Sequence, residues 1–166
     1  MREKIQSIWI GILVRISVFA ASMWFVFTFL FGVWICDSRD MYPAVREGDL
    51  VVYCRKVSLA RQDAVVYETS GEVRIGRIAA TAGEVLGKTG DGKLTIDGRI
   101  QPVQPRQGIY EETGVTGNFA EKAIPSGKLF LLGDARAEAT DSRKLGPVTE
   151  KDIRGKVFML WRRRGI

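Results

Sequence analysis

Histidine is absent from the 166 residues of this chain, and cysteine occurs only twice. Without histidine there is no protease triad with an imidazole base and no zinc site with histidine ligands. Cys36 and Cys54 are too few for a cysteine-only structural zinc site or a disulfide-dense domain. Two free, partly buried thiols are predicted, and one disulfide between them stays open. We expect no metal and no cofactor, so nucleophilic chemistry would need a serine–lysine pair or carboxylates.

Positive charge is in excess, with 25 Lys and Arg against 19 Asp and Glu. Much of this excess is terminal, at Arg2, Lys4 and Arg15 and at residues 162–164. No stripe of basic residues alternates with aromatic residues, as a nucleic-acid surface would require. The distribution favours a membrane surface and no nucleic-acid partner, with ordinary solvated charge as an equal alternative.

One long apolar run lies near the amino terminus, and residues 16–35 within it carry no charge. About 20 apolar residues suffice to cross a bilayer as a helix. The run is longer than the apolar region of a cleaved signal peptide and ends without a small-residue cleavage site. The pattern predicts a transmembrane signal anchor at 8–35, with 1–7 cytoplasmic and 36–166 extracytoplasmic because of the basic residues that precede it.

Short β-branched and aromatic runs follow, separated by glycine-rich turns, and no long amphipathic helix is present. The expected strands are 49–53, 64–67, 72–79, 94–96, 128–132 and 155–161. Residues 101–122 contain Pro and Gly throughout and are expected to form a loop. The pattern predicts an all-β domain, mainly antiparallel and partly barrel-like, after one membrane helix.

Four motifs occur in order after the apolar run, the first of them in residues 36–49 (CDSRDMYPAVREGD). The motif residues are Met41, Pro43, Gly48, Asp49 and Val51; Arg77, Gly83 and Glu84; Gly133, Asp134 and Arg136; and Asp141, Ser142, Arg143, Gly146 and Val148. Over nearly the whole chain this order resembles signal peptidase I, the membrane-bound serine endopeptidase that removes signal peptides from exported proteins. The resemblance implies a structural role for Gly133, Asp134, Arg136, Asp141, Ser142 and Arg143.

The chain departs from that family at the residues that perform the chemistry. The resemblance implies a serine nucleophile and a lysine base at positions that Asp40 and Gly76 occupy here. Ala139 stands where a supporting serine would orient the lysine, and the glycine at 76 is expected to leave space in the groove floor. Ser38 matches a hydroxyl that helps to stabilise the oxyanion in some members. The altered positions indicate a site released from catalysis.

Two substitute mechanisms are weaker alternatives. Asp40 could pair with Asp134 or Asp141 as a carboxylate dyad, although structural ion pairs with Arg136 and Arg143 explain these aspartates more simply. Ser38 could act as the nucleophile, but a hydroxyl without a base is a weak one.

A peptide groove is a further expectation from the resemblance, since family members bind an extended signal peptide by strand addition. Its walls would include Met41, Tyr42, Pro43, Ala64, Val65, Val66, Val73 and Ile75. The alternative is that these residues are only core and edge strand.

Three functions follow from these observations. The first is a non-catalytic signal peptidase I homologue at the cell membrane that binds an exported preprotein or a pilin-like surface protein. Inactive members of this kind act in Gram-positive pilus assembly, which would make a sortase a possible partner. The second is an active signal peptidase with a non-standard site. The third is a tethered β domain that uses no groove, whereas DNA-linked repressors of similar fold lack the membrane helix.

Overall fold

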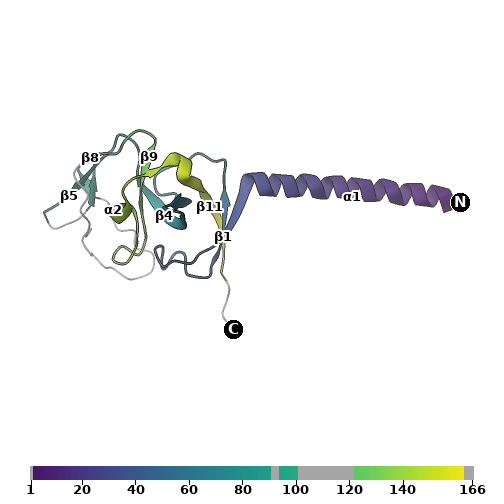
Figure 1. The fold of residues 1–166 in the computed structure, drawn as a ribbon, viewed down its shortest axis with the longest axis horizontal. Coiled ribbons are helices and arrows are strands. Elements are labelled where there is room, and N and C mark those ends of the chain that lie inside the picture. The colour runs from purple at the N-terminus through teal and green to yellow at the C-terminus, as the bar shows by residue number, and fades with distance from the viewer. Residues whose placement is uncertain (1, 91–93, 101–121, 163–166) are drawn as a thin grey trace.

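The first element of the protein is a long apolar helix that projects away from the sheets (Figure 1). The structure is a computed structural model that describes residues 2–90, 94–100 and 122–162. Helix α1 covers Arg2–Leu30, and Trp9–Leu30 within it is long and apolar enough to cross a membrane. None of this span is buried inside the protein, as a membrane anchor requires.

The helix ends earlier than the apolar pattern predicts. Residues 31–35, expected as the last part of the membrane segment 8–35, form strand β1 (Phe31–Ile35) instead. Strand β1 pairs antiparallel with β2 (Leu50–Cys54), so that Phe31 lies opposite Cys54 and Ile35 opposite Leu50. The prediction was wrong at this end because a continuous apolar run has no period that separates helix from strand.

Two antiparallel sheets make up the rest of the described chain. The larger has the order β1-β2-β11-β3-β4-β9-β10 and the smaller β7-β6-β5-β8. Their remaining strands are β3 (Ala64–Thr69), β4 (Glu72–Ala80), β5 (Val85–Lys88), β6 (Leu94–Ile96), β7 (Arg99–Ile100), β8 (Lys122–Ala123), β9 (Lys128–Leu132), β10 (Val148–Thr149) and β11 (Ile153–Trp161). The mainly antiparallel fold is confirmed. The barrel-like expectation is corrected, since neither sheet closes on itself among the described strands.

Helical structure outside α1 is limited, in the described residues, to α2 (Ser142–Leu145) and the short η1 (Glu150–Asp152). The predicted hairpin around residues 94–96 is confirmed: Asp97 and Gly98 join β6 to β7 with φ angles of 50° and 73°. Positive φ at both central residues is what a tight hairpin turn of this twist requires. The short strands β5, β8 and β10 were not predicted, and most of the expected loop 101–122 lies outside the described residues.

The core lies on both faces of the larger sheet because side chains alternate along each strand. On one face Val66 and Ile75 pack with Met41 and Val45 from the connecting segment, residues 36–49. On the other face Val65 and Tyr67 pack with Ile78, Leu129, Leu131 and Val148. The buried Met41 therefore fixes the position of its neighbour Asp40 against the sheet.

The two cysteines lie at opposite ends of the β1–β2 pair. Cys54 is opposite Phe31, whereas Cys36 follows the other end of β1 and its amide donates to the Asp49 carbonyl at 2.9 Å. At about 3.3 Å per residue the separation is about 16 Å, beyond the reach of a disulfide. Both thiols are free, as predicted. Burial raises the pKa of Cys36, which makes this thiol unreactive.

Candidate functional site

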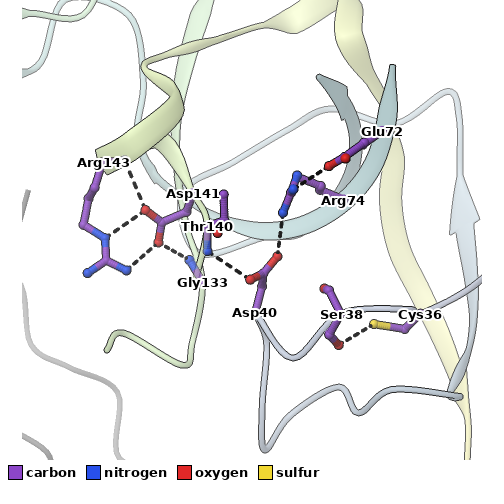
Figure 2. Close-up of polar contacts among 9 residues, drawn as sticks. All are labelled: Cys36, Ser38, Asp40, Glu72, Arg74, Gly133, Thr140, Asp141 and Arg143. Atoms are coloured by element: carbon purple, nitrogen blue, oxygen red, sulfur yellow. Dashed lines mark hydrogen bonds and ion pairs between the residues drawn. The ribbon is translucent and has the colours of Figure 1, made fainter. Parts of the chain in front are cut away.

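Asp40 lies in the connecting segment and joins three parts of the protein (Figure 2). Its Oδ1 accepts a hydrogen bond from the Thr140 amide at 3.0 Å, and its Oδ2 accepts one from Arg74 Nη1 at 3.3 Å. Its backbone carbonyl accepts from the Ala135 amide at 3.0 Å. Both carboxylate oxygens are engaged and the side chain is 10% exposed, so Asp40 serves as a structural contact between elements.

Arg74, on β4, is the cation of this cluster and was given no role in the sequence-based predictions. Its guanidinium also donates to the Glu72 carboxylate, so one arginine bridges two acids. The signal that could have identified it is the strand period, which places Arg74 and Gly76 on the same face of β4. An ion pair between Arg74 and Asp40 therefore stands beside the position where the resemblance implies a lysine.

Gly76 does not open the space that was expected. A Cβ atom built on this residue would lie 3.3 Å from Tyr67 Cε1 and 3.4 Å from Leu131 Cβ. The Tyr67 ring is fully buried and covers the glycine from the neighbouring strand. The prediction was wrong because the pattern of one strand does not show which side chain its neighbour supplies.

The Tyr67 hydroxyl is buried without a hydrogen-bond partner in the described residues. Burial raises the pKa of Tyr67, and the carboxylates of Asp141 and Asp40 raise it further. The phenol therefore stays protonated at neutral pH and cannot replace the lysine as a base.

Tyr67→Phe should leave the protein as stable or stabilise it by about 1 kcal/mol, because it removes an unpaired buried hydroxyl and keeps the ring. Urea unfolding of the full chain in detergent, followed by tryptophan fluorescence, measures the change. A loss of more than about 1 kcal/mol would show that the hydroxyl is hydrogen-bonded in the native protein.

Ser38 also has a buried Oγ atom without a partner in the described chain. Its backbone carbonyl accepts from the Cys36 thiol at 3.2 Å, which fixes the turn before Asp40. The Asp40 amide likewise makes no hydrogen bond to any described residue. This turn therefore contains two hydrogen-bond donors without a partner in the described chain.

Asp141 is the most heavily hydrogen-bonded acid near the site and is 1% exposed. It accepts from the Gly133 amide at 2.9 Å and from Arg143 Nε and Nη2, each at 2.8 Å. It also caps α2 through the Arg143 amide at 3.1 Å. The predicted ion pair of Asp141 with Arg143 is confirmed. Ser142 also connects α2 to β9, because its Oγ accepts a hydrogen bond from the Leu131 amide at 3.0 Å.

Asp134 pairs with Arg77 rather than with Arg136, which corrects the predicted partner. Arg77 Nε and Nη2 donate to its two oxygens at 3.0 and 2.7 Å. Each aspartate of the site thus pairs with a different arginine. In the described part of the chain, no hydrogen bond joins two of these aspartates. Burial lowers the pKa of Arg136, although the carboxylates of Asp134 and Asp141 favour its charged form.

The 133–141 loop packs tightly against the Asp40 turn. A Cβ atom on Gly133 would lie 2.4 Å from the Asp40 carbonyl oxygen and 2.4 Å from Ala139 Cβ. Ala139 is buried at 1% exposure. The structure thus brings Asp40, Gly133 and Ala139 into direct proximity, while Gly76 lies on β4 beneath Tyr67.

The residues predicted to line a groove fall into two groups. Met41, Val65, Val66 and Ile75 are at most 1% exposed, so a peptide could meet these four residues only through their main chain. Ala64 and Val73 are partly buried against the cluster that contains Met41, Val66 and Ile75. Tyr42 is 45% exposed and precedes Pro43 through a cis peptide bond.

The amino-terminal half of β4 has one unpaired edge. Strand β3 pairs with all of residues 72–77, but β9 pairs with β4 only from Arg77 onward. No described strand covers the second edge of residues 72–76. Unpaired amide and carbonyl groups at such an edge can accept an added strand.

Comparisons with known proteins identify the family of this chain. The family model described as "Signal peptidase, peptidase S26" matches residues 9–162. Signal peptidase I T of Bacillus subtilis is 32% identical over 139 residues, which cover 76% of this chain and 72% of that protein. Inactive signal peptidase IA of Staphylococcus aureus is 28% identical over 142 residues, covering 81% of each chain. A crystal structure of a signal peptidase I from Enterococcus faecalis has a TM-score of 0.49 and 21% identity, over 61% of this chain and 98% of that one. The chain belongs to the signal peptidase I family, peptidase S26.

Proposed function

We propose that this chain is a non-catalytic signal peptidase I homologue that binds exported or surface proteins at the membrane without cutting them. The observation that carries the proposal is the state of Asp40, whose carboxylate is engaged by Arg74 and by the Thr140 amide. A nucleophile needs a free hydroxyl and a base beside it, and Gly76 supplies no amine. The similarity to a relative named as inactive supports the same conclusion.

Peptide binding is supported by the main chain near Asp40. The uncovered edge of residues 72–76 can extend the sheet by one strand, and the unpaired donors at Ser38 and Asp40 can hold a peptide carbonyl. Neither feature requires the missing catalytic side chains.

A membrane position is supported by apolar surface beyond helix α1. Val33 and Ile35 on β1 are each 61% exposed, and Phe158 and Trp161 on β11 are 70% and 66% exposed. Strand β1 follows α1 directly, and β1 and β11 lie on the side of the domain next to α1 (Figure 1). We propose that the amino terminus is cytoplasmic and that the β domain faces outward.

The finer proposal is an assembly role for sortase-built pili, in which this protein would hold a pilin-like precursor beside the sortase. It rests on the resemblance to inactive family members of that kind. Deleting the gene should reduce the pilin polymer on immunoblots of cell-wall extracts while precursor processing continues normally. Complementation with the unaltered gene should restore the polymer. A deletion strain with an unchanged polymer pattern would reject the assembly role.

A further inference from the structure

Three charged side chains, those of Asp40, Glu72 and Arg74, lie beside the uncovered edge of β4. Relative to a serine, Asp40 adds one negative charge to the site. Arg74 restores one positive charge but is shared between Asp40 and Glu72. These three side chains therefore carry a net charge of −1 beside the free strand edge.

Glu72 is the accessible member of this cluster. Its side chain is 65% exposed, against 21% for Arg74 and 10% for Asp40. Its Oε2 accepts from Arg74, whereas its Oε1 has no hydrogen-bond partner among the described residues. A carboxylate oxygen is therefore available to a ligand at the mouth of the site.

Two other aspartates of the site are paired with arginines. Asp134 pairs with Arg77 at 2.7 Å and Asp141 with Arg143 at 2.8 Å. Glu72 and Asp40, by contrast, share the single guanidinium of Arg74.

Two buried polar atoms near the Asp40 turn have no hydrogen-bond partner in the described residues. The Tyr67 hydroxyl is fully buried and unpaired, and Asp40 is one of the carboxylates that act on it. Tyr67 lies directly opposite Arg74 in the β3–β4 register. The hydroxyl can accept a hydrogen bond, and together with Ser38 Oγ it leaves the Asp40 turn short of polar partners.

We propose that the groove selects peptides that carry a lysine or arginine side chain next to Glu72. A peptide added to the edge of β4 continues the pleat, so its alternate side chains share a face with Glu72, Arg74 and Gly76. A cation on that face would meet the exposed Glu72 carboxylate, whereas an acidic side chain would be repelled by it. The inference rests on the proposed peptide binding and names its ligand class.

The test is a peptide series in which one residue moves along an otherwise fixed sequence. Fluorescein-labelled acetyl hexapeptides of alternating Val and Ala, each with one Lys, Glu or Gln substitution, are titrated with the full chain in nanodiscs. The nanodiscs contain only zwitterionic lipid, since anionic lipid would itself attract the basic peptides. Empty nanodiscs provide the background for the anisotropy signal.

We expect a lysine in one register to bind about fivefold more tightly than glutamine, and glutamate about fivefold more weakly, with both differences reduced in high salt. Glu72→Gln should remove the preference. Glu68→Gln is the matched control, because Glu68 is a 48% exposed acid that pairs with Arg154 on the next strand. The preference should survive that change.

Equal affinity for the Lys, Gln and Glu peptides in every register would overturn the charge selection and leave peptide binding intact. A preference that persists in Glu72→Gln would overturn the role of Glu72. If no peptide binds, the proposed groove itself is rejected and this inference with it.

Discussion

Asp141→Ala should lower the free energy of unfolding by about 3–5 kcal/mol, the largest loss expected from a single side chain of the site. The change would leave the guanidinium of Arg143 buried and unpaired, because Arg143 is 7% exposed. It would also remove the acceptor of the Gly133 amide and the cap of α2. Breaking a buried pair from one side costs far more than the pair itself contributes.

The loss is measured by urea unfolding of the full chain in detergent, with secondary structure and tryptophan fluorescence as two probes. Glu68→Ala is the control, since the Glu68–Arg154 pair is exposed and should contribute at most about 1 kcal/mol. If Asp141→Ala and Glu68→Ala lowered the free energy of unfolding by equal, small amounts, the role of the 133–141 loop as the buried support of the site would be contradicted.

The double variant Asp40→Ser with Gly76→Lys should remain without turnover and should be less stable than the natural protein. The serine would release the Thr140 amide and leave the half-buried Arg74 with Glu72 alone. The lysine would need space that Tyr67 and Leu131 fill, and burying its amine has a desolvation cost. Ala139 would still provide no hydroxyl to orient the lysine.

Cleavage of a labelled precursor and the unfolding midpoint are measured together on the double variant, the two single variants and Gly76→Ala. The alanine variant adds only the Cβ atom, so it separates crowding at that atom from the longer lysine side chain. We expect Gly76→Ala to lose less stability than Gly76→Lys. Turnover by the double variant would show that Tyr67 yields to the lysine and that a hydroxyl at position 139 is dispensable.

The strands could be predicted from the sequence because alternation and turn residues are local signals, as around Val66 and Ile75. The assignment of Asp40 and Gly76 to the serine and lysine positions rests on the ordered motifs and stays a prediction. The end of the membrane helix could not be predicted, because residues 31–35 are apolar in either state and only their pairing with β2 selects a strand.

The contacts within the site could not be predicted because they depend on pairing between distant segments. The link from Asp40 to Thr140 spans 100 residues, and the link to Arg74 spans 34. The register that places Tyr67 opposite Arg74 decides what fills the space at Gly76. These contacts change the interpretation of Asp40 from a lost nucleophile to a residue that joins the connecting segment, β4 and the 133–141 loop.

The most direct test of the central claim is a cleavage assay on the unaltered protein. The full chain in detergent is incubated with a labelled precursor that carries its signal peptide, beside an active signal peptidase I as the positive control. We predict no product at the signal-peptide junction at any time that the control reaches completion. Product from the unaltered chain, absent when Ser38 is replaced by Ala, would contradict the account and assign the chemistry to Ser38.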